Sequence, residues 1–297
     1  MIKNKMKKIP LLIIIASFFL ISCSKSKDYY APHYSKNIKI TASIDDSTDF
    51  SDTVFEIKDI ISVYAWIGCP YAIPPFFVVY NSLNIYNCRY NWISKPPMIW
   101  YDKHTDHYFI GVYPHRKITN FIADNYTLDV CHQSASDLLI ASNTSGISAE
   151  DEISVPLIFH HVLTRLTIKL NCNTKSSCTP VVNSVKIYAN ITGTINYIKK
   201  TVTATGTVCE VSIPATINNF TYSSVMLPQT IKKIVIQIDG TDYIYNNEQG
   251  IVLQEGKSIL LPFNLLDNGE LLLGNTSIID WETVEDNDPE NIAIEKD

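Results

Sequence analysis

Alternation between hydrophobic and polar positions runs through most of the chain and predicts β-strands. One such segment, residues 38–44, gathers its apolar side chains at every second position: Ile38, Ile40, Ala42 and Ile44. Because successive side chains of a strand point to opposite faces of its sheet, this pattern is typical of a strand with one buried face. Residues 181–191 and 259–265 alternate in a similar way.

The same reasoning predicts a β-hairpin in the second half of the chain. Residues 234–238 and 243–245 alternate on the two sides of Asp239-Gly240. An Asp-Gly pair favours the positive φ angles of a type I′ turn, which connects antiparallel strands. Further β-branched and aromatic runs predict strands at residues 60–67, 76–80, 98–101, 108–113 and 137–141.

The predicted fold class is all-β and sandwich-like, because no long run has a sustained helical period. A polar, acidic, glycine-containing stretch at residues 142–153 indicates a linker. We therefore expect an N-terminal β-sandwich domain at residues 37–150, a C-terminal one at 151–281 and an acidic tail at 282–297. Around residues 160–166 the alternation changes phase, which predicts a bulge or a single helical turn.

Residues 1–22 have the pattern of an export signal. Four lysines within residues 1–8 precede an uncharged apolar run at residues 11–21. Such a run is too short for a permanent membrane helix, which needs about 20 apolar residues. The stretch Leu20-Ile21-Ser22-Cys23 resembles the lipobox of bacterial lipoproteins, in which the signal is removed and the cysteine is acylated. We therefore expect a lipid on Cys23, followed by a tether at residues 23–36.

Removal of the signal makes the chain more acidic. It leaves 20 basic against 30 acidic side chains, so the formal charge changes from −6 to −10. An acidic chain argues against nucleic-acid binding, which needs a basic face for the phosphates. It also argues against a polybasic membrane-binding patch, so contact with the membrane is expected through the lipid on Cys23.

Six further cysteines remain in the exported chain: Cys69, Cys88, Cys131, Cys172, Cys178 and Cys209. Export permits disulfides, and six cysteines allow 15 pairings, which the sequence leaves open. The chain has no CxxC pair, so neither a redox dithiol nor a zinc knuckle is indicated.

Histidines give the strongest signal for a metal or catalytic site. His104 and His107, beside Asp102 and Asp106, could form a metal cluster, but the spacing matches no established motif and a solvated hairpin tip is favoured. In His160-His161 we expect one buried, hydrogen-bonded histidine and one exposed histidine. No GxSxG, Walker A or GxGxxG motif occurs. The sequence therefore predicts a non-enzymatic protein with no cofactor and no metal.

Aromatic residues gather around proline-rich segments and support a second hypothesis. Most are expected in the core, where large aromatic side chains dominate sandwich interiors: Trp66, Phe76, Phe77, Trp92, Trp100 and Tyr101. Tyr71, which lies between Pro70 and Pro74, is the member most expected at the surface. An exposed ring can stack on a sugar, so a glycan-binding surface lipoprotein is the alternative function.

Several stretches together resemble the fimbrillin-like family. They are Trp100-Tyr101, residues 108–114 (YFIGVYP), 137–141 (DLLIA), 155–163 (VPLIFHHVL), 165–168 (RLTI), Gly256-Lys257 and 278–281 (IIDW). Their order and spacing match over nearly the whole mature chain. The resemblance implies two transthyretin-like Greek-key sandwiches in tandem, in a lipoprotein-derived subunit or anchor of what are called type V pili.

The resemblance also implies a site. In shaft subunits of the family a protease removes the first strand of the N-terminal domain, and a partner's strand fills the groove by β-strand addition. Here the candidate exchangeable strand carries Ile38, Ile40, Ala42 and Ile44. The family is typically cut after an arginine, and no arginine lies near residues 36–60, which favours an anchor or accessory subunit over a shaft subunit. Lys36, Lys39 and Lys58 are possible substitutes for that arginine.

The partners implied are other pilus subunits, through donor-strand-type contacts, and the outer membrane, through the lipid on Cys23. Surface ligands of host or bacterial cells are a third class of partner for an adhesin. The implied location is a lipid anchor in the outer membrane, at the cell surface or in the fimbrium.

Overall fold

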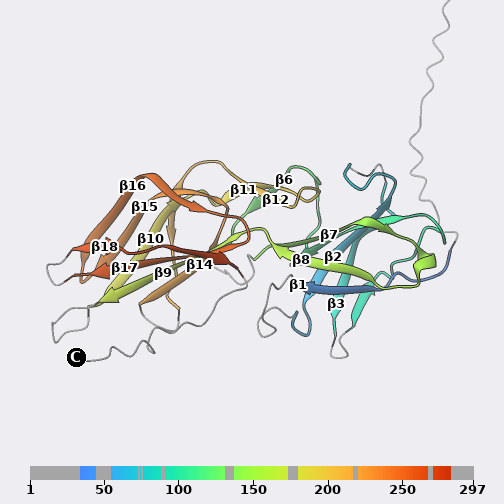
Figure 1. Ribbon diagram of the computed structural model, residues 1–297, viewed down its shortest axis with the longest axis horizontal. Helices are drawn as coiled ribbons and strands as arrows, with labels where there is room; N and C mark the ends of the chain where they lie inside the picture. The colour runs from blue at the N-terminus through green and yellow to red at the C-terminus, as the bar shows by residue number, and fades with distance from the viewer. Residues whose placement is uncertain are drawn as a thin grey trace, which may run out of the picture. The chain divides into compact units, whose positions relative to one another are not determined.

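β-Strands form almost all of the regular structure, which confirms the predicted all-β fold class (Figure 1). The computed structural model describes residues 34–44, 55–72, 74, 76–87, 91–130, 137–172, 180–216, 220–266 and 270–281. The elements of the first half are β1 (Ile40–Ile44), β2 (Ile60–Ile67), β3 (Val79–Tyr86), β4 (Trp92–Lys95), β5 (His107–Tyr113), β6 (Asp124–Thr127), β7 (Leu139–Ile147), the 3-10 turn η2 (Ala149–Asp151) and β8 (Val155–His161).

The second half consists of strands alone: β9 (Thr164–Cys172), β10 (Val182–Ala189), β11 (Thr192–Asn196), β12 (Thr201–Thr205), β13 (Cys209–Ser212), β14 (Thr221–Met226), β15 (Gln229–Ile238), β16 (Thr241–Leu253), β17 (Lys257–Leu265), β18 (Leu271–Leu273) and β19 (Ser277–Asp280). The predicted strands at residues 38–44, 60–67, 108–113, 181–191, 234–238 and 259–265 overlap β1, β2, β5, β10, β15 and β17, and β2 has the predicted bounds. Residues 98–101 do not form a strand, although Ile99 makes a single bridge.

Seven strands of the first half form one sheet, in the order β1-β8-β7-β5-β2-β3-β4. The outer strand β1 runs parallel to β8, whereas β8 and β7 are antiparallel. The two ends of the sheet meet, because Asn37, before β1, forms an antiparallel bridge with Ile99, after β4. The sheet therefore curls round and encloses a core of apolar side chains.

β2 shows that this sheet is buried on both faces. Ile61, Val63 and Ala65 belong to the core that the sheet encloses, and Tyr64 and Trp66 belong to a second core that also contains strands of the second half. All five are at most 1% exposed. A strand buried on both sides has no need to alternate, which explains the nearly continuous apolar run at residues 60–67.

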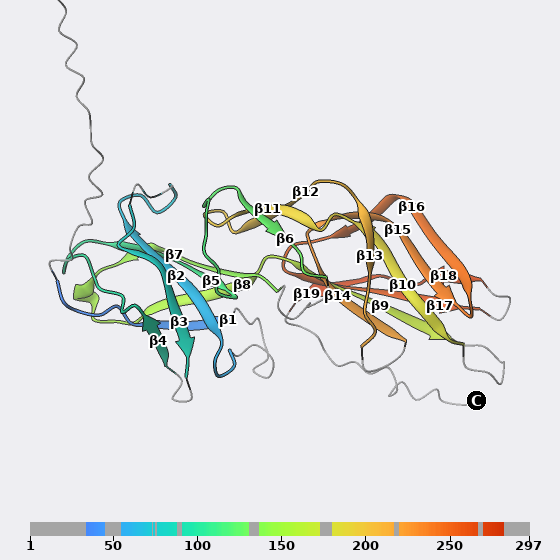
Figure 2. The same cartoon turned by 180° about the vertical axis from the view of Figure 1, so that it is seen from behind.

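Two sheets pack face to face in the second half (Figure 2). One has the order β14-β9-β17-β18, with β19 also paired to β17, and the other has the order β13-β10-β15-β16. Inward side chains such as Leu166 and Ile168 of β9 and Ile234 and Ile236 of β15 share one core. A three-stranded sheet, β12-β11-β6, joins β6 of the first half to this half.

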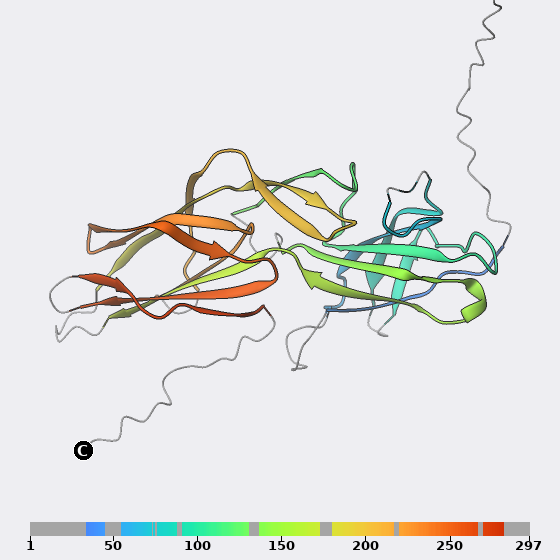
Figure 3. The same ribbon diagram turned by 45° about the horizontal axis from the view of Figure 1, so that its top comes forward.

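The same pairing occurs once in each half. β1 runs parallel to β8, and β9 runs parallel to β17. Between the two arrangements the green ribbon runs from the first half of the chain into the second (Figure 3). Only Val162 and Leu163 separate β8 from β9, and both are buried. The change of phase predicted around residues 160–166 is therefore a two-residue break between strands of different sheets, instead of a bulge or helical turn.

The linker predicted at residues 142–153 is wrong. β7 continues to Ile147, η2 follows, and β8 begins at Val155. β7 and β8 are antiparallel neighbours, with Leu139 opposite His161. The polar residues of this stretch turn the chain within one sheet, so a boundary at residues 150/151 would divide that sheet.

The predicted hairpin is confirmed, and its second strand carries an irregularity. Asp239 and Gly240 connect β15 to β16 with φ angles of 51° and 79°. Further along, Ile231 pairs with Ile251 and Lys233 with Asn246, so β16 has four residues where β15 has one. Such a bulge distorts the ladder and bends the strand, and β16 is the outer strand of its sheet.

Gly111 of β5 marks a close approach inside the first half. A Cβ atom there would lie 2.6 Å from Cζ of Phe159 and 3.3 Å from Cδ1 of Leu157. We predict that Gly111→Ala lowers the free energy of unfolding by about 1–3 kcal/mol through overpacking. Denaturant unfolding of Gly111→Ala, Phe159→Leu and the double variant would check this. Because leucine is smaller than phenylalanine, the double variant should lose less stability than the sum of the losses of the two single variants. Strictly additive losses would contradict the contact between position 111 and Phe159.

Candidate functional site

The candidate site is the rim of the seven-stranded sheet, where β1 lies against β8 (Figure 1). The two strands are parallel, and their register places Ile40 beside Val155 and Ile44 beside Phe159. β1 has no second strand along residues 40–44 among the paired strands of the described chain. Its outer edge is therefore a rim of the sheet.

Burial along this strand follows the predicted alternation. Ile38 and Ile40 are 3% and 8% exposed, whereas Thr41 between the apolar positions is exposed. Ala42 and Ile44 are half-buried and pack against the same enclosed core. The structure thus places all four predicted side chains on one face of an edge strand.

Main-chain groups of β8 form a continuous row toward β1. The amide of Val155 donates to the carbonyl of Lys39 at 2.8 Å. Since main-chain groups of a strand alternate sides, Val155, Leu157 and Phe159 all direct theirs toward β1, and Pro156, which lacks an amide hydrogen, directs its own away. By the same ladder geometry Thr41 of β1 points toward β8 and Ala42 points away.

Main-chain hydrogen bonds also close the start of β1 against the segment that follows β4. The amide of Ile38 donates to the carbonyl of Met98 at 2.9 Å, and the amide of Trp100 donates to the carbonyl of Lys36 at 3.2 Å. The Nζ of Lys36 donates to the carbonyl of Ala149 in η2 at 2.8 Å. We call this set, residues 36–38 with 98–100 and Ala149, the clasp.

An aromatic side chain fills the core near the other end of β1. Phe55 is 5% exposed, and its ring centroid lies 5.1 Å from Trp92 of β4, 5.6 Å from Tyr113 of β5 and 5.2 Å from Phe159 of β8. All three contacts are edge-to-face, the arrangement that aromatic pairs prefer. Because Ile44 pairs with Phe159, the end of β1 and Phe55 share one neighbour.

The two histidines predicted at a hairpin tip, His104 and His107, have different environments. His104 is exposed, as expected, and its Nδ1 lies 2.7 Å from Oε2 of Glu150. His107 is fully buried in β5, which makes the prediction of a solvated position wrong for this residue. The sequence carries a signal for this burial, because His107 lies on the same face of the strand as Phe109 and Gly111, two and four residues further on, and that face points inward. Among the described residues no group of three His, Cys, Asp or Glu side chains is placed to hold a metal ion.

His161 confirms the expected buried histidine of the His160-His161 pair. Its Nδ1 lies 3.0 Å from Oδ1 of Asp137, and its side chain is 8% exposed. Its ring stacks on Trp281, with the centroids 4.4 Å apart, and the guanidinium of Arg165 lies 5.0 Å from the centre of that indole. As whole residues His160 and His161 are both half-buried, so the expectation that the second histidine is exposed is wrong.

The aromatic residues predicted in the core divide by burial: Phe77 and Trp92 are half-buried and pack against the two cores, whereas Tyr101 is half-buried and belongs to neither core. Trp66 and Trp100 are core residues at 1% and 2% exposure, and Tyr71 is 71% exposed. Phe76, which was expected in the core, is 36% exposed. Cys69 lies at the surface near Tyr71, and Cys69 and Cys209 are both free thiols.

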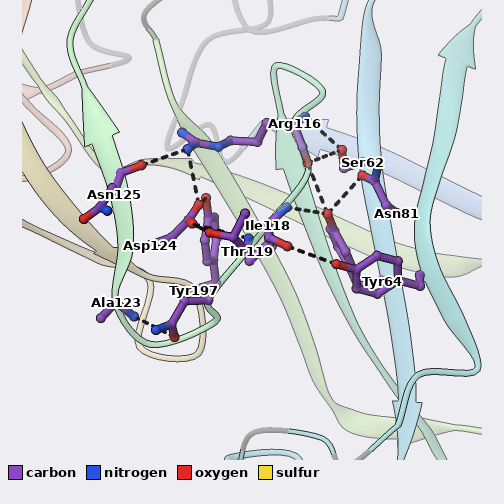
Figure 4. Close-up of polar contacts among 12 residues, drawn as sticks. Ser62, Tyr64, Asn81, Arg116, Ile118, Thr119, Ala123, Asp124, Asn125 and Tyr197 are labelled. Atoms are coloured by element: carbon purple, nitrogen blue, oxygen red, sulfur yellow. Dashed lines mark hydrogen bonds and ion pairs between the residues drawn. The ribbon is translucent and has the colours of Figure 1, made fainter. Parts of the chain in front are cut away.

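A buried polar cluster lies where β2, β6 and the residue after β11 meet (Figure 4). The carboxylate of Asp124 accepts hydrogen bonds from Thr119 Oγ1 at 2.5 Å and Tyr197 Oη at 3.0 Å, and its Oδ2 lies 3.3 Å from a guanidinium nitrogen of Arg116. Burial raises the pKa of the Tyr64 and Tyr197 hydroxyls. Both tyrosines stay protonated and donate, so the cluster joins elements and offers no reactive group.

The predicted lipid-bearing Cys23, the tether up to residue 33 and the acidic tail at 282–297 lie outside the described residues. Within the described residues, no helix has the length and apolar character to cross a membrane.

Comparison with known proteins identifies the family. The fimbrillin-like family model matches residues 42–281, which is most of the chain. This chain belongs to the fimbrillin-like family. A search of curated protein sequences found no match.

Solved structures share the fold of this fimbrillin-like chain at low sequence identity. A candidate cell adhesion protein of Bacteroides uniformis has a TM-score of 0.65 and 17% identity, with 82% of this chain and 98% of that chain covered. A candidate cell adhesion protein of Bacteroides ovatus has a TM-score of 0.66 and 16% identity, covering 85% and 99%. A fimbrial protein of Bacteroides vulgatus has a TM-score of 0.54 and 10% identity, covering 82% and 99%.

Family membership supports a role of this chain as a pilus subunit or adhesin at the cell surface, in contact with other pilus subunits. It indicates a structural role and names no reaction. The finer assignments of anchor, partner strand and ligand are taken up below.

The packing of β1 gives a direct prediction. Ile40→Ala should lower the free energy of unfolding by about 2 kcal/mol or more, because it removes a buried side chain and leaves a cavity against Val155. Thr41→Ala, at the exposed neighbour, should change it by no more than about 0.5 kcal/mol. Denaturant unfolding of both variants measures the difference, and equal losses would show that β1 is not held by its apolar face.

Proposed function

We propose that this fimbrillin-like chain is a lipid-anchored subunit of a type V pilus that joins its partners by strand addition at the β1 rim. The observation that carries the proposal is the construction of that rim. An edge strand with one apolar face lies against a complete row of main-chain groups on β8. A partner strand with the same alternating pattern could replace β1. Its main-chain groups would hydrogen-bond to β8 and supply affinity, and its apolar side chains would pack against the enclosed core and supply specificity.

The proposal includes two transthyretin-like sandwich domains in tandem. The repeated parallel pairs, β1 with β8 and β9 with β17, support it. We place the division at Val162-Leu163, between β8 and β9, rather than at residues 150/151. The three-stranded sheet and the cluster around Asp124 then bind the two domains together.

The proposed membrane attachment is an acyl group on Cys23. An anchor or accessory role is favoured over a shaft role by the lack of an arginine at residues 36–60 and by the placement of two of the three lysines there, Lys36 and Lys58. Lys36 has its ammonium group engaged by Ala149 and by Glu152, 3.7 Å away. Lys58 lies in a tight turn with a φ of 84°, and its amide donates a hydrogen bond to the carbonyl of Tyr86. A protease needs an extended segment, so Lys36 and Lys58 are not presented as cleavage sites, whereas Lys39, which is exposed directly before β1, is the accessible lysine of the three.

Mass spectrometry of the native protein tests attachment and processing together. We expect an N-terminus at Cys23 that carries acyl chains, with residues 24–44 intact. A new N-terminus beyond residue 36, found in polymers that resist SDS, would contradict the anchor and establish a shaft subunit.

Strand addition is tested by weakening β1 in place. Thr41→Pro removes an amide that points toward β8, whereas Ala42→Pro changes an amide that points away from it and leaves the ladder intact. We expect the purified Thr41→Pro chain to capture a labelled peptide of residues 34–44, and the Ala42→Pro chain to capture much less. Fluorescence anisotropy measures the binding. No capture by either variant, or equal capture by both, would refute exchange at this rim.

A glycan-binding adhesin is the second candidate, and it is favoured by the exposure of Tyr71. If the ring is a sugar platform, Tyr71→Ala should abolish the signal of the wild-type chain on a glycan array. Because Tyr71 lies away from both cores, the variant should keep its thermal stability. A wild-type chain that binds no glycan would remove this candidate.

A further inference from the structure

His107 is a buried histidine whose protonation state is fixed by its two neighbours. It is 0% exposed, and its ring packs against Trp100 and Phe109, whose ring centroids are 4.9 and 6.5 Å away. Nδ1 lies 2.8 Å from the carbonyl oxygen of Thr105, and the amide of Tyr101 donates to Nε2 at 3.1 Å. A carbonyl only accepts and an amide only donates, so the ring is neutral with its hydrogen on Nδ1.

The bond to Tyr101 connects His107 to the clasp. Tyr101 directly follows Trp100, whose amide donates to Lys36, and Met98 of the same segment accepts from Ile38. One short segment, residues 98–101, is therefore fixed at one end by the histidine ring and at its other end holds the start of β1.

A proton on Nε2 would destroy this arrangement. The protonated nitrogen and the amide of Tyr101 would both be donors, and they would face each other at the present 3.1 Å. The charged ring would also be desolvated, and this burial lowers the pKa of His107 below its ordinary value of 6.5. Acid must therefore displace the ring or the Tyr101 amide, and displacement of that amide carries residues 98–100 away from Lys36 and Ile38.

We propose that His107 is an acid-sensitive latch for β1: its protonation opens the clasp and exposes the edge of β8 to a partner strand. The part of this proposal that concerns the partner rests on the proposed strand addition. The opening of the clasp depends only on the contacts of this chain.

Charged groups near His107 oppose the opening only weakly. Asp102 and Asp106 favour the charged ring, but Asp102 already accepts hydrogen bonds from the amide of Thr105 at 2.6 Å and its hydroxyl at 2.5 Å. Residues paired with His107 in the neighbouring strands are apolar, Ile67 of β2 and Ile147 of β7. Desolvation by burial therefore outweighs the carbonyl of Thr105 and the two carboxylates, which favour the charged ring.

A second histidine acts in the opposite direction at the surface. His104 and Lys103 both contact Glu150 of η2, and their attraction lowers the pKa of that carboxyl. These contacts hold η2 against the loop at residues 102–106 and so favour the closed clasp. These pairs are exposed, and exposed ion pairs contribute little, so the buried histidine decides the direction.

The closed clasp should be more stable at neutral pH than at acidic pH. The closed chain binds fewer protons at His107 than the open one, so the closed state is favoured above the ordinary pKa of 6.5 and loses ground as the pH falls below it. In the window between the two pKa values, the equilibrium constant for opening should rise about tenfold per pH unit.

The experiment is methyl NMR of the full chain, labelled at isoleucine δ1 and histidine rings, from pH 7.5 to 5. We expect the signals of Ile38 and Ile40 to leave their closed-state positions in step with the titration of the His107 ring. Core isoleucines of the second half, such as Ile236, should stay unchanged. His104→Gln is the matched control, because it removes the exposed member of the same HxxH motif and should leave the transition in place.

His107→Gln should abolish the acid transition of Ile38 while the His104→Gln chain keeps it. Ile38 signals that stay closed down to pH 5, or that open without titration of the His107 ring, would overturn the proposal even if His107→Gln did not fold. Uptake of the labelled 34–44 peptide separates the two proposals. Acid opening without uptake would refute strand addition alone, and uptake that ignores pH would refute the latch alone.

Discussion

Burial of both faces of the seven-stranded sheet is the constraint on which the rest of the structure depends. One face encloses the core that contains Phe109 and Phe159, and the other carries Tyr64 and Trp66 into the core of the second half. Because the enclosed core has to be sealed, the sheet curls until the segments before β1 and after β4 meet. Removal of β1 would therefore open the enclosed core and not merely break a surface contact.

The sealing of that core is uneven along β1. At its start, main-chain bonds and Lys36 hold the strand, and near its end Phe55 packs between Trp92 and Phe159. Between these points residues 40–44 depend on one ladder and on apolar contacts. A strand that is fixed at its ends and open along its length can be exchanged without unfolding the sheet, provided that one end is released first. This is why the environment of a single buried histidine beside the clasp matters for the proposed assembly.

Local patterns predicted the strands well and predicted long-range pairing poorly. Alternation at residues 38–44 and the Asp239-Gly240 turn were sufficient, because each is a property of neighbouring residues. The pairing of β6 with β11 was missed, since the polar stretch of residues 124–127 has no period and its partner lies far along the chain. The polar stretch at residues 142–153 was read as a linker because a tight connection within a sheet and a connection between domains use the same residue types.

The bulge in β16 has a consequence for the number of partners that one chain can accept. β16 is the longest strand of the described chain and an outer strand, so a regular ladder there would offer a second rim for pairing. The four residues of β16 opposite one of β15 interrupt that rim, as bulges do in proteins that avoid edge-to-edge association. If the proposed strand addition uses β1 alone, each copy accepts one partner strand, and an assembly built from it grows as an unbranched, directional chain.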